Sequence, residues 1–138
     1  MKQILLIDLF AQIYRAFYGV KFLTPANEEK PSNAIFSMTR FLLKIQNLFP
    51  NMEGAFVSDL GKPEHRLEIA ADYKANRPHM PEKMRMQVPV IFELISAFGW
   101  QIHQQESWEA DDLISAFVHF FPDFNFKIIS SNLSLLIN

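Results

Sequence analysis

The chain has 138 residues, a length that suits one domain with a substantial core, since 49% of its residues are hydrophobic and 14 are Phe. Its formal net charge of −2 excludes a globally basic surface, so any nucleic-acid site must be a local patch. The absence of cysteine excludes disulfides, thiolate nucleophiles and Cys-ligated zinc or iron–sulfur sites, and it fits a reducing compartment.

The first predicted element is a short buried strand at residues 3–7, QILLI, which is closed by Asp8. This apolar run is too short for a signal peptide or a membrane span. We therefore expect a cytoplasmic protein without a membrane partner.

The next predicted elements are a helix and a second strand. Residues 32–49 carry apolar side chains at helical spacing behind Ser32, which predicts a helix with Ser32 as its cap. The buried strand predicted at 54–58 follows and ends at Asp59.

The C-terminal half repeats this alternation. Residues 80–99 predict a helix in which Pro89 introduces a kink or a break. A weak strand at 100–103, a helix at 109–121 and a buried strand at 126–130 follow. This order predicts an α/β fold, in which helices cover both faces of a parallel sheet.

Acidic residues stand where these predicted strands end. Asp8 and Asp59 each follow a buried strand, and the helix after the third strand opens with Glu109, Asp111 and Asp112. Ligands bind beyond the carboxyl ends of the strands in such sheets, so we expect these acids to converge on one rim. Carboxylate oxygens suit hard divalent cations, which predicts Mg²⁺ or Mn²⁺ as the cofactor.

A purely structural interpretation of these acids stays open. Acids are favoured in the first turn of any helix, and an aspartate after a strand can be a turn residue. Against this interpretation, Asp111 and Asp112 are adjacent and repel each other unless a cation lies between them.

A cationic segment, DLGKPEHRLEIAADYKANRPHMPEKMR, follows the second predicted strand. Its cationic and aromatic side chains are Lys62, Arg66, Tyr73, Lys74, Arg77, His79, Lys83 and Arg85. Within YKANRP, Lys74 and Arg77 suit consecutive phosphates, and Tyr73 suits stacking on an end base. Acids in the same segment offset part of this charge, so a solvated mixed-charge face is the alternative.

Four stretches occur in this order along the chain: LLIDLFAQIYRAFYG, DLGKPEHR, YKANRP and EADD. Together they resemble the bacterial 5′-to-3′ exonuclease and flap endonuclease family, which includes the N-terminal nuclease domain of DNA polymerase I. The resemblance runs from Ile4 to about Leu136. It implies a resolvase-like, PIN-like domain, a metal-dependent nuclease activity on DNA with a free 5′ end or flap, and a helical arch at about 62–85.

The resemblance also implies roles for single residues. The family's first carboxylate cluster corresponds to Asp8, Asp59, Glu109, Asp111 and Asp112. Its substrate-contact positions correspond to Tyr14, Arg15, Arg66, Lys74 and Arg77, and the local charge pattern adds Tyr73, Lys83 and Arg85 as DNA contacts. We assign the catalytic roles to Asp8, Asp59, Lys74 and Arg77.

The chain departs from the family pattern at three points. SSNLSLL stands where the family usually has Gly-Asp-Lys-Asp-Leu, so Asn132 and Ser134 replace two aspartates and the charge that holds a second metal is lost. Leu9 replaces a glycine after the first aspartate and is expected to crowd the backbone near the metal. The chain ends at Asn138, before the family's further metal aspartates and its helix-hairpin-helix DNA-binding part.

Three functions therefore stay open. The first is a nuclease of this family, impaired and working with one well-bound ion. The second is a non-catalytic domain that binds branched or 5′-ended DNA. The third is a fragment completed by another polypeptide, such as a polymerase or the missing C-terminal nuclease part.

Overall fold

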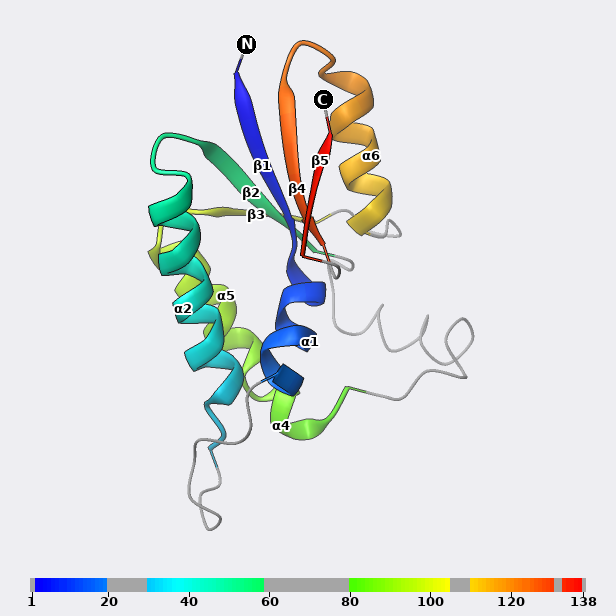
Figure 1. Ribbon diagram of the computed structural model, residues 1–138. Helices are drawn as coiled ribbons and strands as arrows, with labels where there is room; N and C mark the ends of the chain where they lie inside the picture. The colour runs from blue at the N-terminus through cyan, green and yellow to red at the C-terminus, as the bar shows by residue number, and fades with distance from the viewer. Residues whose placement is uncertain (1, 20–29, 59–79, 105–109, 131–132, 138) are drawn as a thin grey trace, which may run out of the picture.

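The computed structural model describes residues 2–19, 30–58, 80–104, 110–130 and 133–137. In this part of the chain a five-stranded sheet forms the middle layer, and helices pack on both of its faces (Figure 1). The arrangement confirms the predicted α/β architecture.

The sheet is mostly parallel. Its strands are β1 (Gln3–Asp8), β2 (Glu53–Ser58), β3 (Gln101–Gln104), β4 (Asn125–Ser130) and β5 (Leu133–Ile137), in the spatial order β3-β2-β1-β4-β5. β1 pairs in parallel with β2 and β4, and β2 pairs in parallel with β3, so the four predicted strands share one direction. β5 was not predicted, and it turns back to pair antiparallel with β4 at the edge of the sheet.

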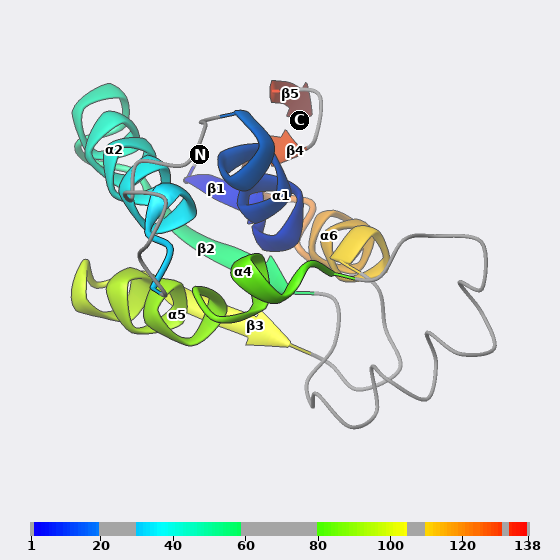
Figure 2. The same ribbon diagram turned by 90° about the horizontal axis from the view of Figure 1, so that it is seen from below.

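The helices form the outer layers. They are α1 (Leu9–Gly19), α2 (Asn33–Leu48), α4 (Glu82–Arg85), α5 (Val88–Ala97) and α6 (Ala110–Phe120). Figures 1 and 2 show α1, α2, α4 and α5 on one side of the sheet and α6 on the other. α1 is an addition to the predicted elements, and it continues directly from β1 with Phe10, Ile13 and Phe17 buried on one face.

The helix predicted at 80–99 is two helices. Pro81 is the N-cap of α4, and the chain passes through Met86 and Gln87 before α5 begins. Pro89 lies in the first turn of α5, where a missing N–H group leaves no hydrogen bond unmade, so the proline marks a break as predicted. Gly99 follows α5 with a φ of 91°, a left-handed conformation that glycine adopts without strain.

The prediction that Ser32 caps α2 is correct in position but wrong about the side chain that makes the cap hydrogen bond. Ser32 occupies the N-cap position, but its side chain makes no cap hydrogen bond with any residue that the structure describes. The side chain of Gln87 takes that role, because its Oε1 accepts a hydrogen bond of 3.0 Å from the backbone N–H of Ile35.

The core lies on both faces of the two central strands. Leu5, Ile7 and Phe56 face α1, α2 and α5, whereas Leu6 and Val57 face α6. Strand residues alternate between faces, so burial of both faces requires an uninterrupted apolar run. This requirement is why the sequence predicts β1 and β2 as buried strands.

Gly54 lies in β2 where no side chain fits. A Cβ atom there would be 2.5 Å from Cζ3 of Trp100 and 2.6 Å from the carbonyl oxygen of Leu5. We expect Gly54→Ala to lower the free energy of unfolding by about 1–3 kcal/mol, because the neighbouring backbone of β1 cannot yield without disturbing strand pairing. Unfolding in urea measures this change.

Gly19→Ala is the matched control, because a Cβ atom at Gly19 meets nothing within 4 Å among the described residues. Its free energy of unfolding should be unchanged or slightly raised, since alanine favours a helix end more than glycine does. Wild-type stability of Gly54→Ala would contradict the close packing of β1, β2 and Trp100.

Candidate metal centre and nucleic-acid interface

The strand order places a topological switch point at the carboxyl ends of β1 and β4. β1 and β4 are neighbours, but the chain between them first builds β2 and β3 on the other side of β1. The connections at the carboxyl ends of β1 and β4 therefore diverge, and parallel α/β sheets bind ligands at such a point. Asp8, the last residue of β1, is half-buried there.

The Asp8 carboxylate has a structural contact. Its Oδ1 accepts a hydrogen bond of 3.3 Å from the backbone N–H of Ala11, so it caps the first turn of α1. A carboxylate has two oxygens with several lone pairs, so accepting this hydrogen bond is chemically compatible with a metal–oxygen bond. The structural and the metal-binding interpretations of Asp8 are therefore compatible.

The Leu9 side chain points into the core, not toward the switch point at the carboxyl end of β1. Its side chain is fully buried in the apolar layer formed with α1, α2 and α5. The expected crowding by a leucine in place of glycine is thus directed into the core.

Gln12 connects α1 to the carboxyl end of β4. It lies one turn after Asp8 on α1 and is 4% exposed. Its Nε2 donates a hydrogen bond of 3.0 Å to the carbonyl oxygen of Ser130, the last residue of β4. Gln12 is absent from the predicted site residues, although a polar residue among the apolar positions Phe10, Ile13 and Phe17 is a signal of such a role.

The start of α6 lies against the same strands. Ala110 and Ile114 are buried together with Leu6 of β1 and Val57 of β2. Asp112 is exposed in the first turn of this helix. The structure thus brings the opening of α6 to the carboxyl-terminal halves of β1 and β2, as the rim hypothesis requires.

β2 ends in a buried hydroxyl. Ser58 is 0% exposed, and its Oγ has no hydrogen-bond partner within the described part of the chain. Asp59, which follows it, lies outside the described residues, as do Glu109 and the side chain of Asp111.

Metal binding is therefore judged on part of the predicted ligand set. Within residues 2–19, 30–58, 80–104, 110–130 and 133–137, no group of three His, Asp or Glu side chains is arranged to hold a metal ion. Asp8 and Asp112 supply carboxylate oxygens, which are the donor type that Mg²⁺ and Mn²⁺ take. The donors present fit such an ion in kind.

The described DNA-contact candidates lie on α1 and α4. Tyr14 packs partly against the core and stacks on Tyr18, with ring centroids 6.4 Å apart. Arg15 is exposed on α1, and Lys83 and Arg85 are exposed on α4. α4 and α1 belong to the same helical layer on one side of the sheet (Figures 1 and 2).

Charge on these two helices is mostly positive. α1 contains no acidic residue, and α4 pairs Arg85 with Glu82 at 3.8 Å between exposed side chains. Such an exposed ion pair is weak, so it leaves Arg85 able to meet a phosphate. The candidates Arg66, Tyr73, Lys74 and Arg77 lie outside the described residues.

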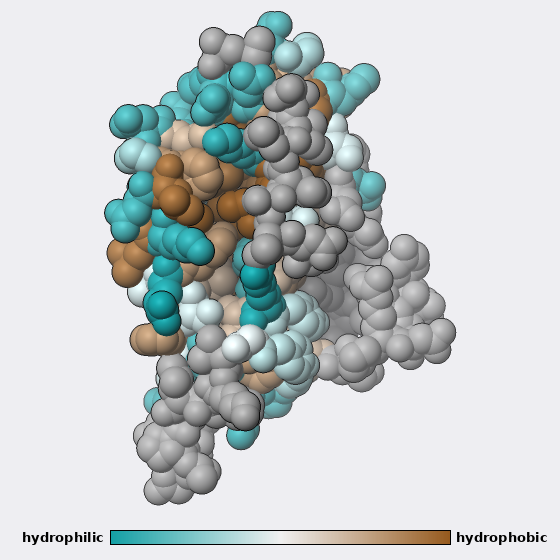
Figure 3. All heavy atoms as spheres, in the orientation of Figure 1, coloured by the Kyte–Doolittle hydropathy of each residue, from teal (hydrophilic) through white to brown (hydrophobic). Residues whose placement is uncertain are grey.

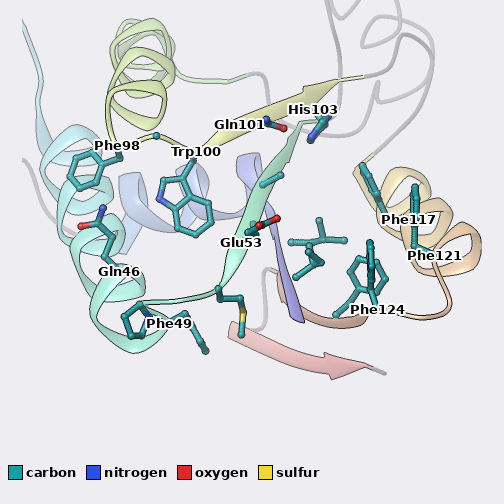
Figure 4. A pocket seen from close by; sticks show the side chains of 18 residues that line it. Gln46, Phe49, Glu53, Phe98, Trp100, Gln101, His103, Phe117, Phe121 and Phe124 are labelled. Carbon is teal, nitrogen blue, oxygen red and sulfur yellow. The ribbon is translucent and has the colours of Figure 1, made fainter. Parts of the chain in front are cut away.

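A separate groove of about 650 Å³ opens at the amino-terminal halves of the strands, away from Asp8. Figure 4 shows Trp100 and Glu53 on one part of its wall and Phe117, Phe121 and Phe124 on another. Apolar residues also reach the surface over α2 (Figure 3), where Phe36, Leu43 and Leu48 are exposed. Neither region gathers the acids that a metal centre requires.

The fold and the site define an α/β domain whose mostly parallel sheet carries an aspartate, Asp8, at its switch point. The family described as "5′-3′ exonuclease, N-terminal resolvase-like domain" matches residues 3–134. The chain therefore belongs to this family, which confirms the resemblance stated above.

Named relatives agree with the family. DNA polymerase I of Pseudomonas aeruginosa is 36% identical over 111 residues, which cover 80% of this chain and 12% of the relative. The 5′-3′ exonuclease of Aquifex aeolicus is 31% identical over 130 residues, 93% of this chain and 44% of the relative. The chain thus spans less than half the length of these two relatives. None of the helices in the described ranges is long and apolar enough to cross a membrane.

Substitutions of Asp8 separate its two roles. Asp8→Asn keeps an oxygen that can cap α1 but loses the negative charge, whereas Asp8→Ala loses both. We expect Asp8→Ala to lower the free energy of unfolding, measured without metal, by about 1 kcal/mol, and Asp8→Asn to change it little. Both substitutions should abolish the heat of Mn²⁺ binding in calorimetry.

Retention of Mn²⁺ binding in Asp8→Asn would show that Asp8 only caps the helix. Equal loss of stability in both variants would instead show that Asp8 does not stabilise α1 as a cap.

Proposed function

We propose that the chain is the resolvase-like part of a 5′-3′ exonuclease or 5′-flap endonuclease, which binds DNA with a free 5′ end and one divalent cation but cleaves poorly. The observation that carries this proposal is the position of Asp8, half-buried at the carboxyl end of β1 with the opening of α6 packed beside the same strands. The family membership supports the DNA substrate.

The proposed metal ligands are the five rim acids, Asp8, Asp59, Glu109, Asp111 and Asp112. A bound Mg²⁺ or Mn²⁺ would supply a water nucleophile of lowered pKa and polarise the phosphoryl oxygen. In this proposal the acids hold the cation, and the cation neutralises the electrostatic repulsion among their negative charges.

The proposed DNA contacts come from two places in the chain. Arg15 on α1 and Lys83 and Arg85 on α4 are exposed, and Tyr14 on α1 is half-buried. Lys74 and Arg77 hold the scissile phosphate in this proposal, Arg66 holds a further phosphate, and Tyr73 stacks on an end base. We assign residues of about 62–85 to an arch over the 5′ end, of which 80–85 are described.

Impaired cleavage follows from the residues after β4. Asn132 and Ser134 stand where the family pattern has aspartates, and neither provides an anionic ligand. Cleavage with two ions stabilises the attacking and the leaving oxygen, so a missing ion removes one of these effects. A C-terminal nuclease part or an attached polymerase would supply the remaining ligands and duplex contacts.

The double variant Lys74→Ala/Arg77→Ala should weaken binding to 5′-flap DNA, and the affinity should fall alike for unrelated sequences because phosphate contacts carry no base information. The slope of log K against log salt should shrink by about 2. Fluorescence anisotropy over a salt series measures both quantities.

Arg40→Ala/Lys44→Ala is the control for net charge, since it removes the same two charges from exposed positions on α2. This control should retain the wild-type affinity and slope. If the two double variants behave alike, the YKANRP segment is a solvated face and the DNA interface is misplaced.

Restoring charge tests the impairment. Asn132→Asp/Ser134→Asp should add a second Mn²⁺ site, because two carboxylates replace neutral side chains near the ends of β4 and β5. We expect the wild-type chain to cut a 5′ flap at the detection limit and the double variant to cut measurably faster in a single-turnover assay with Mn²⁺. Efficient cleavage by the wild-type chain would overturn the impairment.

A further inference from the structure

Gln87 is a fully bonded glutamine inside the helical layer. It lies in the turn between α4 and α5 and is 1% exposed. Its Nε2 donates hydrogen bonds of 2.9 Å to Oδ1 of Asn33 and to the carbonyl oxygen of Lys83, and its Oε1 accepts one of 3.0 Å from the N–H of Ile35. The carboxamide thus joins α4 to the start of α2.

Asn33 extends this connection to α1. It is the first residue of α2 and is 1% exposed. Its Nδ2 donates a hydrogen bond of 2.8 Å to the carbonyl oxygen of Phe17 in the last turn of α1. We call this set of hydrogen bonds the Asn33–Gln87 bridge. It runs from Phe17 through Asn33 to Gln87, and from Gln87 to Ile35 and Lys83.

The bridge acts at helix ends. The carbonyl groups in the last turn of α1 and the N–H groups in the first turn of α2 have no partners within their own helices, and the bridge satisfies one of each. Met84 of α4 is fully buried in the core beneath, so α4 is held by an apolar side chain as well as by the bridge. Burial alone fixes the depth of α4, whereas directional hydrogen bonds also fix its orientation.

Orientation matters because of what α4 carries. Lys83 and Arg85 are exposed, and Met84 between them is buried. A rotation of this short helix about Met84 would change the directions in which both cations point. The bridge opposes such a rotation, since Gln87 is bonded to the Lys83 backbone itself.

We propose that Asn33 and Gln87 are positioning residues for DNA binding, which hold α4 so that Lys83 and Arg85 meet phosphates. This inference rests on the proposed function. It adds two buried carboxamides that touch no DNA but determine how many phosphates the surface engages.

Gln87→Met tests the proposal, because methionine has a similar length but cannot form the three hydrogen bonds. We expect the affinity for 5′-flap DNA to fall about threefold to tenfold and the salt slope to shrink by about 1 to 2, as two phosphate contacts are weakened. A purely structural role would lower the folded fraction, which scales the amplitude of binding and leaves the slope unchanged.

Two comparisons make the test specific. Ile45→Val trims the core of α2 away from the bridge and should keep the wild-type slope. In a Lys83→Ala/Arg85→Ala background, Gln87→Met should cause no further loss of slope, since the contacts it positions are already gone. If Gln87→Met does not fold by circular dichroism, Asn33→Leu carries the same expectation, because it breaks only the links to Phe17 and Gln87.

A wild-type slope for Gln87→Met would overturn the inference, as would a further loss of slope in the Lys83→Ala/Arg85→Ala background. An unchanged slope for Lys83→Ala/Arg85→Ala itself would also overturn it, because α4 would then contact no phosphate. The Lys74 and Arg77 experiment decides the proposed function separately, so the failure of one proposal is distinguishable from failure of the other.

Discussion

Strand β1 pairs in parallel with a neighbour on each side, and the rest of the described structure depends on that pairing. Parallel neighbours cannot be joined by a tight turn, so helices must cross over the sheet and bury both of its faces. Because the chain leaves β1 toward β2 and returns to β4, a switch point lies at the carboxyl end of β1. Asp8 lies at this switch point because it is the last residue of β1.

Buried amides then set directions that apolar packing leaves free. Gln12 connects the first turns of α1 to the end of β4, across 118 residues of sequence. Gln87 connects α4 to α2, and Asn33 connects α2 to α1. A buried amide is favourable only when its partners are in place, so each of these residues favours one arrangement of the elements around it. The start of α1, the end of β4 and the helix α4 are therefore positioned by hydrogen bonds within the core.

The sequence predicts those features that depend on local pattern. The uninterrupted apolar runs of β1 and β2 follow from burial on both faces, and Pro89 breaks the helical stretch because it cannot donate a hydrogen bond. Local pattern failed where the partner is distant. Ser32 has the right residue type for a cap, but Gln87 fills the role from 52 residues away from Ile35. Likewise β5 exists through its pairing with β4, and Gln12 is recognisable as a site residue only when Ser130 is placed beside it. The positions of Asp8 and of the start of α6 were predictable, because parallel topology fixes where strands end.

Family membership and local chemistry point in different directions at the end of β4. The family match extends through residue 134, yet the residues at 132 and 134 are Asn and Ser. The proposed function therefore combines one metal site, at Asp8 and the stretch 109–112, with the loss of a second one. Anomalous scattering from crystals of the chain soaked in Mn²⁺ tests it most directly. The account predicts a single manganese peak within bonding distance of Asp8 and of an acid in the stretch 109–112. Two manganese peaks near Asp8, or a peak bound by neither Asp8 nor that stretch, would contradict the proposal of a single metal site.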